Sequence, residues 1–97
     1  LSIDMRAYRV EIEHEEVSLT RKEIELLFTL ASHPGVAFSR DQLLNQVWGY
    51  DYYGDSRTVD SHMTRLRSKL DYTTHPHWDL KTVWGIGYKF EINEDKV

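Results

Sequence analysis

Residues 57–70 read RTVDSHMTRLRSKL, and this stretch decides the fold. Its large apolar side chains recur at spacings of four, three and four residues, at Val59, Met63, Leu66 and Leu70. On a helix these spacings produce one narrow apolar stripe that faces a core. The opposite side contains no acid and carries Arg57, Ser61, Thr64, Arg65 and Ser68. The pattern therefore predicts a helix over residues 58–70 with a basic outer face.

Three more charged residues belong to this helix. Arg67 and Lys69 lie on the flanks of the outer face, and Asp60 lies in the first turn. The helix dipole favours a negative charge in the first turn. We therefore expect Asp60 to have a capping-like role.

The segments before this helix change from strand-like to helical periodicity. Residues 1–19 contain short alternating apolar runs separated by charged breaks, which indicate small antiparallel strands. Thr20 and Glu23 form a capping box that opens a helix ending near Ser32. A second capping box, of Ser39 and Gln42, opens a short helix. Glycine and aspartate in residues 49–55 then predict a loop, which also carries three tyrosines.

The segment after the helix of residues 58–70 has the pattern of a hairpin. Residues 80–92 alternate around Gly85 and Gly87. The order of elements predicts an α+β fold, a winged helix-turn-helix with a small N-terminal antiparallel sheet, a three-helix bundle and a C-terminal β-hairpin wing. In this architecture the last helix enters the major groove of DNA.

Length and composition limit the possible functions. Ninety-seven residues, 40% of them hydrophobic and 29% charged, are enough for one globular domain, so residues 1–97 are expected to form a single effector domain. The chain has no cysteine, which excludes disulfides, thiolate nucleophiles and cysteine metal sites. No apolar run approaches the roughly twenty residues needed to cross a bilayer, so we expect a cytoplasmic chain with no membrane partner.

Charge is distributed unevenly along the chain. The formal net charge of −4 argues against a polyanionic partner when it is taken alone. However, residues 57–89 carry six basic and three acidic residues, whereas the flanking segments are acidic. Such segregation is typical of a nucleic-acid face, although a solvated patch gives the same pattern.

The sequence offers little support for an enzyme. His75 and His77 have no acidic or histidine partner at ligand spacing, and we expect no metal and no cofactor. His14 and His33 are expected at the surface or in turns, and His62 is expected to pack or to touch phosphate. The serines lack a nucleophile elbow, and no glycine-rich phosphate loop precedes a helix. We therefore predict a protein that is not an enzyme.

Four groups of residues together form a specific pattern. They are Leu19, Thr20, Glu23, Leu26 and Leu27; Ser39, Arg40, Leu43, Leu44, Val47 and Trp48; Arg57, Thr58, Val59, Asp60, His62, Arg65, Leu66, Arg67 and Leu70; and Thr82, Val83, Gly85, Gly87, Tyr88 and Phe90. With them, nearly the whole chain resembles the C-terminal effector domain of OmpR/PhoB-class response regulators of bacterial two-component systems. Residues 82–90 are also similar to the ResD-like branch of that class.

This resemblance implies a fold and a set of partners. It implies a four-stranded N-terminal sheet, with the third helix as the reader of double-stranded DNA. It further implies tandem half-sites, head-to-tail dimers on DNA, and a preceding receiver domain that a cognate histidine kinase controls. The chain begins at Leu1 rather than Met, and we expect an excised effector domain without its receiver.

The proposed DNA face can be divided by chemistry. Arg65 is the best candidate for reading bases, because the guanidinium fork matches the two acceptors of guanine. Ser61 and Thr64 lie beside it, while Arg57, Ser68 and Lys69 are expected to touch phosphates. Arg67 has two interpretations, a phosphate contact or an ion pair with an acidic neighbour.

The wing departs from the family in one place. Members of the family often have Arg where this chain has Trp84, and Trp cannot supply a cation to the minor groove. We expect that role to pass to Lys81, Thr82 or Lys89, while Trp84 packs or stacks on sugar. Thr64 likewise replaces a common Arg. These departures predict modest affinity of one domain, with dimerisation through the receiver adding effective concentration.

The loop of residues 49–55 corresponds to the segment that contacts RNA polymerase in this family. Its candidate contact residues are Tyr50, Asp51, Tyr52, Tyr53 and Asp55. The alternative is that one or two of the tyrosines fold back onto Trp48 and the core.

A winged helix that binds protein is the main competing function, because fold does not dictate function. A protein-binding helix would expose apolar or mixed-charge side chains. The outer face of residues 58–70 instead shows Arg, Ser and Thr without an acid, which favours DNA.

Overall fold

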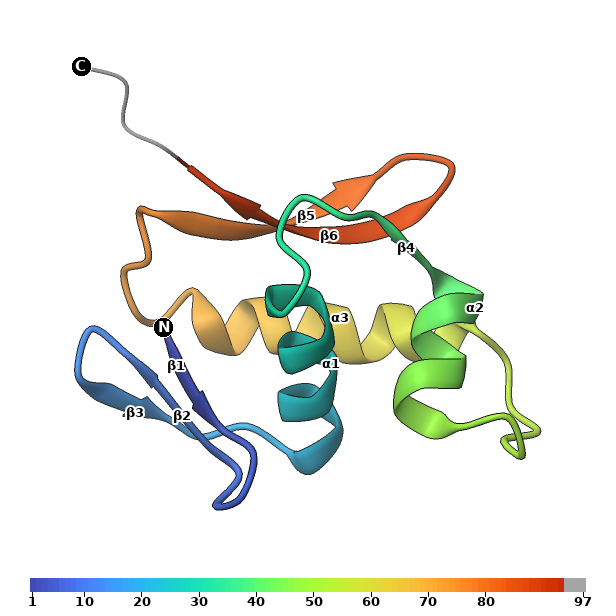
Figure 1. Cartoon of the computed structure of the whole chain (residues 1–97), viewed down its shortest axis with the longest axis horizontal. Helices are drawn as coiled ribbons and strands as arrows, with labels where there is room; N and C mark the ends of the chain where they lie inside the picture. Colours follow the sequence, from blue (N-terminus) through green and yellow to red (C-terminus); the bar gives the residue numbers. More distant parts are fainter. Residues whose placement is uncertain (94–97) are drawn as a thin grey trace.

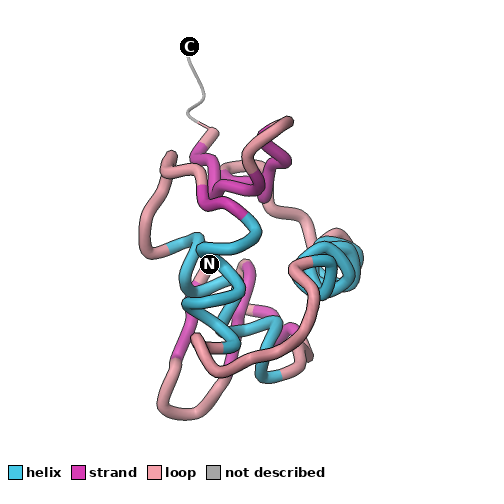
Figure 2. Tube along the Cα trace, turned by 90° about the vertical axis from the view of Figure 1, so that its right-hand side faces the viewer, coloured by secondary structure: helices cyan, strands magenta, loops and turns pink. Residues whose placement is uncertain are grey.

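The computed structural model describes residues 1–93 of the 97-residue chain. A small N-terminal sheet lies at the lower left in Figure 1, beside the helices, and a second sheet lies above them. Figure 2 shows the same order from the side, with α3 (Arg57–Leu70) seen nearly end-on at one edge of the molecule. Helix α3 is thus a peripheral element with one side against the core.

The N-terminal sheet has three strands in the described part of the chain. They are β1 (Ser2–Asp4), β2 (Arg9–Ile12) and β3 (Glu15–Val17), paired antiparallel in that order. The prediction of a fourth strand in this sheet is wrong. Short turns occupy the residues between the three strands, so no segment long enough for another strand remains before α1. Three residues after Val17, the chain reaches Thr20, which is the N-cap of the next helix.

Both predicted capping boxes are present. Thr20 accepts a hydrogen bond from the Glu23 amide and its own amide donates to the Glu23 carboxylate, which fixes the start of α1 (Arg21–Ala31). Ser39 and Gln42 form the same reciprocal pair before α2 (Arg40–Leu43). Helix α2 continues as a wider π-helical segment, η1 (Leu44–Trp48), which ends at Gly49 with φ of 93°.

Helix α3 begins one residue before the predicted start and ends where predicted. Its apolar stripe is buried as expected, at Val59, Met63, Leu66 and Leu70. These side chains join α1, β2 and the C-terminal sheet in one core. Burial of this stripe is the main force that holds α3 to the domain, since apolar burial contributes roughly 25 cal/mol per Å².

The C-terminal hairpin is longer than predicted and has a third strand. Strands β5 (Trp78–Val83) and β6 (Gly87–Ile92) pair antiparallel, and β4 (Phe38–Ser39) pairs with the other edge of β6. A Cβ at Gly87 would lie 2.0 Å from the backbone oxygen of Phe38. Glycine at this position therefore lets β4 approach β6. Sequence reasoning missed β4 because two residues are too few to show alternation.

Within the described residues, no helix has the length and apolar character needed to span a membrane.

Candidate nucleic-acid interface

The outer face of α3 is exposed at every position predicted for it, namely Arg57, Ser61, Thr64, Arg65 and Ser68. The hydroxyls of Ser61 and Thr64 donate back to the helix carbonyls of Arg57 and Asp60. Their oxygens keep lone pairs that point outward and can accept hydrogen bonds. The face therefore offers one strong donor group, Arg65, set among small polar side chains.

Arg65 differs from the other cations of residues 57–89 in having no hydrogen-bond or ion-pair partner within residues 1–93. The remaining five are engaged as Arg57 with Asp55, Arg67 with Thr82, Lys69 with Glu23, Lys81 with Asp79, and Lys89 with Glu91. A guanidinium without an internal partner can give all its donors to a ligand. Among the cations of residues 57–89, Arg65 is thus the one whose donors are all available to a ligand within the described part of the chain.

Arg57 lies at the start of α3 and is highly exposed. Its guanidinium contacts the Asp55 carboxylate at 2.8 Å, and Asp55 also accepts from the Arg57 amide. Asp55 thereby satisfies an amide in the first turn of the helix. The Arg57 guanidinium lowers the pKa of Asp55 below its usual value through this hydrogen bond. Asp55 is therefore tied to the helix start as well as to the loop before it.

Lys69 turns inward rather than toward the outer face. Its Nζ lies 2.7 Å from Oε1 of Glu23, whose side chain is fully buried. Burial raises the pKa of Glu23, but hydrogen bonds from Lys69 and from Thr20 outweigh it, so the pKa lies below its usual value. The other oxygen of Glu23 has no hydrogen-bond partner within the described residues. Lys69 thus neutralises a buried charge between α3 and α1.

Arg67 connects α3 to the wing. One terminal nitrogen donates to Oγ1 of Thr82 at 3.0 Å, and the guanidinium carbon lies 5.2 Å from the centre of the Tyr88 ring. Within residues 1–93 Arg67 makes no ion pair, so that interpretation is wrong, and the phosphate contact stays a prediction.

Asp60 lies in the first turn of α3, as predicted, but its carboxylate bonds to other elements rather than to an amide of the helix. Its Oδ1 accepts hydrogen bonds from the Tyr88 hydroxyl and from Nε of Arg40, the latter at 2.8 Å. Burial raises the pKa of Asp60, but these two hydrogen bonds outweigh it, so the pKa lies below the usual value. Burial, together with the bond to Asp60, raises the pKa of Tyr88. The start of α3 is therefore bonded to β6 and α2 by side chains.

Lys81 and Lys89 lie on the side of the wing sheet that faces away from α3. Trp78, Leu80, Tyr88 and Phe90 are buried, and Thr82 bonds to α3, so the alternate positions 81 and 89 point to the other side. There each lysine contacts an acid on its own strand at 3.5 Å, Asp79 or Glu91. The structure thus separates these two lysines from the outer face of α3.

Trp84 stands at the tip of the wing. It is 90% exposed, beside Gly85 in a turn with φ of 80° and the half-exposed Ile86. Figure 1 shows the turn between β5 and β6 at the same end of the molecule as the start of α3. The indole is available to a ligand rather than packed against the domain.

The three tyrosines of residues 49–55 differ in exposure. Tyr50 and Tyr53 are almost fully exposed, whereas the Tyr52 ring lies 6.3 Å from the Trp48 ring. Asp51 is exposed beside them. Packing against Trp48 thus accounts for one tyrosine and leaves two on the surface.

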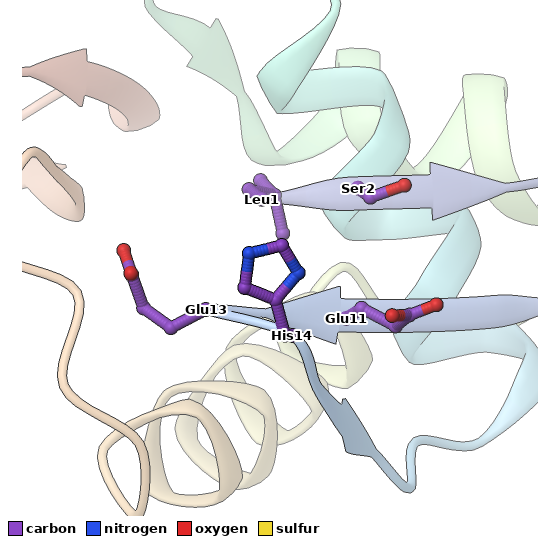
Figure 3. Close-up of a pocket in the computed structure, with 5 residues that line it drawn as sticks. All are labelled: Leu1, Ser2, Glu11, Glu13 and His14. Carbon is purple, nitrogen blue, oxygen red and sulfur yellow. The ribbon is translucent and has the colours of Figure 1, made fainter.

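The histidines are used in packing or turns. The His62 ring contacts Trp48 edge-on at 4.9 Å, and His75 stacks on Trp78 at 4.3 Å. Among residues 1–93, no group of three or more His, Cys, Asp or Glu residues is placed to hold a metal ion. Figure 3 shows a hollow at the N-terminal sheet, lined by Leu1, Ser2, Glu11, Glu13 and His14, which contains none of the predicted site residues.

Residues 14–90 match the family model described as the C-terminal domain of transcriptional regulatory proteins. The chain therefore belongs to this family, an OmpR/PhoB-type winged-helix DNA-binding domain of transcriptional regulators. The family is one of transcription regulators rather than of enzymes.

Among curated proteins, the transcriptional regulatory protein SrrA of Staphylococcus aureus is 50% identical over 96 residues. The match covers 98% of this chain but 40% of SrrA. This chain therefore spans less than half the length of that relative. The narrower likeness to a ResD-like branch stays a prediction.

Solved structures agree with the winged-helix fold. The DNA-binding domain of Bacillus subtilis CssR superposes with a TM-score of 0.78 at 36% identity, covering 92% of this chain and 97% of that one. The AdeR DNA-binding domain in complex with an intercistronic region gives 0.83 at 29% identity, covering 95% and 94%. The Klebsiella pneumoniae RstA DNA-binding domain in complex with the RstA box gives 0.76 at 35% identity, covering 92% and 88%. The predicted fold is confirmed.

Proposed function

We propose that this domain binds specific double-stranded DNA as the output domain of a two-component response regulator. The exposed, acid-free outer face of α3, with Arg65 lacking an internal partner, carries this proposal. Two structurally similar domains were solved in complexes: that of AdeR with an intercistronic region, and that of RstA with the RstA box. A domain with this function would work in the cytoplasm, where bacterial DNA lies.

The proposed contacts follow from the exposure and the internal partners of each side chain, and the pair of Arg57 with Asp55 is an exposed one. Arg65 reads a base pair in the major groove, with Ser61 and Thr64 accepting hydrogen bonds beside it. Arg57 and Ser68 touch phosphates, and Trp84 reaches DNA from the wing tip. Lys69, Arg67 and Thr82 serve the domain instead, and Lys81 and Lys89 face away from α3.

The larger assembly is proposed from the family. A receiver domain, controlled by a histidine kinase, brings two such domains together head to tail on tandem half-sites. Within the described residues, Arg65 is the one cation of α3 that lacks an internal partner. We therefore expect a single domain to make few phosphate contacts. Linked domains raise the effective concentration of the second contact, which supplies the affinity that one domain lacks.

Binding to a pool of random duplexes, at low and at physiological salt, tests the DNA-binding function directly. We expect enrichment of a half-site and an affinity that falls with salt, since each neutralised phosphate adds about 0.9 to the slope of log affinity against log salt. Sequencing of the retained DNA gives the half-site. Absence of both enrichment and low-salt binding, for a fragment carrying two linked copies of this domain, would contradict the proposal and favour a protein partner for α3.

The exposed tyrosines of residues 49–55 are proposed to contact RNA polymerase. We expect Tyr53→Ala to lower transcription in a reconstituted assay about fivefold, because Tyr is enriched among the residues that contribute most to an interface and a loss of about 1 kcal/mol corresponds to about fivefold. DNA affinity should not change, because Tyr53 lies outside α3 and the wing. Tyr72→Ala is the matched control, since Tyr72 is equally exposed elsewhere. Unchanged transcription by Tyr50→Ala and Tyr53→Ala would eliminate this role.

A further inference from the structure

We propose that Tyr88, Asp60 and Arg67 are positioning residues that lock the reading helix to the wing, so that both elements meet DNA in a fixed geometry. The proposal rests on the proposed DNA-binding function and assigns these residues to its specificity. None of the three needs to touch DNA for this purpose. We call the three side chains, with Arg40 and Thr82, the clamp.

The first half of the clamp is a single carboxylate oxygen. Oδ1 of Asp60, in the first turn of α3, accepts from the hydroxyl of Tyr88 on β6 and from Nε of Arg40 on α2. Three elements that are far apart in the sequence thus meet at one atom. Because hydrogen bonds to an ionised acceptor are short and directional, they fix rotation as well as distance.

The second half lies two turns further along the same side of α3. Arg67 donates to Thr82 on β5 at 3.0 Å, and its guanidinium lies over the Tyr88 ring. Tyr88 is therefore held at its hydroxyl by Asp60 and at its ring by Arg67. Two attachment points seven residues apart restrict tilting of the helix against the sheet, which one point would allow.

The apolar core cannot provide the same restraint. The stripe of α3 packs through aliphatic side chains and Met63, whose contacts are non-directional. It holds the helix to the domain, whereas directional hydrogen bonds also fix the rotation of the helix. The ion pair of Asp60 with Arg40 lies at the rim, with the Asp60 side chain 34% exposed, where ion pairs contribute little to stability. This pair therefore affects geometry more than folding.

DNA supplies the reason for a fixed geometry. The separation of the major and minor grooves is set by the duplex, so a helix and a wing that bind together must match that separation. A domain that already holds the two elements in place avoids the entropy of ordering them on binding. Arg65 lies on α3 with Arg67, and Trp84 follows directly after β5, the strand that carries Thr82. The contact between Arg67 and Thr82 thus joins the helix that carries Arg65 to the strand that leads to Trp84.

Tyr88→Phe is the decisive variant, because Tyr88 is only 5% exposed and loses just the hydroxyl that bonds to Asp60. We expect affinity for the enriched duplex to fall about tenfold, with affinity for random duplex of the same length unchanged. Concentrations are those of folded protein, from circular dichroism. Tyr72→Phe removes an exposed hydroxyl and is the matched control, with no expected effect. Equal loss on both duplexes, or no loss, would overturn the proposal.

A second measurement tests the clamp without DNA. Residual dipolar couplings of α3 and of β5–β6 should fit one common alignment tensor in the unaltered domain and two different tensors in Tyr88→Phe. Asp60→Asn should act in the same direction, because it weakens the bonds to both Tyr88 and Arg40. A common tensor that persists in both variants would refute the locking role even if no DNA were bound. Absence of specific binding by the unaltered domain would instead contradict the proposed function.

Discussion

Arg65→Ala is expected to weaken binding to the enriched duplex by about 1 to 3 kcal/mol and to relax the preference at one base pair. Arg65 is exposed at the centre of the outer face and has no partner within residues 1–93 that would hold its guanidinium back. Its bidentate contact to a guanine would be lost completely, because alanine has no donor. Competition titrations against duplexes with each single base change would measure both effects.

Lys81→Ala is the control for this prediction. It removes the same formal charge, but from the side of the wing sheet that faces away from α3, where Lys81 contacts Asp79. We expect its effect to be small and equal on specific and random DNA, as for a distant charge. If Arg65→Ala weakened binding to both kinds of DNA equally, Arg65 would be a phosphate contact, and base reading by this side chain would be wrong.

Lys69→Met is expected to lower the free energy of unfolding by about 2 to 3 kcal/mol. It leaves the fully buried carboxylate of Glu23 without its cation, and removing one partner of a buried pair is strongly destabilising. We place the effect below the usual range for buried pairs because the Lys69 side chain is 36% exposed. Urea unfolding of the domain at neutral pH measures it.

The double variant Glu23→Gln/Lys69→Met separates charge from packing. Gln retains the capping box with Thr20, since Glu and Gln serve equally at this position, but it leaves no buried charge. We expect the double variant to be more stable than Lys69→Met alone. Lys81→Met, which breaks an exposed pair, should change stability by less than about 0.5 kcal/mol. A double variant less stable than Lys69→Met would rule out an uncompensated charge as the cause.

The same pair predicts a pH dependence. The folded-state pKa of Glu23 lies below its unfolded value of about 4.3. Its contribution to stability is therefore complete above that unfolded value and disappears as pH falls through the folded pKa. We expect stability to decrease more steeply with acid in the unaltered domain than in Glu23→Gln. Identical slopes of unfolding free energy against pH below about pH 5 would contradict the lowered pKa.

Periodicity made most of the fold predictable. The stripe from Val59 to Leu70 defined α3, and the two capping boxes, at Thr20 and Ser39, marked the starts of α1 and α2. These signals are local, because an amphipathic helix and its cap involve residues three or four positions apart. The same local geometry correctly gave the exposed face around Arg65. The two-residue strand β4 and the number of N-terminal strands were not predictable from such signals.

The partners of charged side chains were not predictable, because they come from distant parts of the chain. Glu23 and Lys69 are 46 residues apart, and Asp60 and Tyr88 are 28 residues apart. The local pattern placed Arg65 on the outer face and Lys69 on its flank, but it gave no sign that Lys69 pairs with a buried acid. Only the packing of α3 against α1 gives Lys69 a buried carboxylate to neutralise.

The sequence alone thus determined the helices, the wing and the basic outer face, because each depends on short-range spacing. The tertiary structure alone decided which cations serve the domain and which are available to DNA. It turned Lys69 toward Glu23, attached Arg67 to the wing and placed Lys81 and Lys89 on the side away from α3. The physical reason is that the state of a charge depends on the groups that folding brings near it, and those groups lie far away in the sequence.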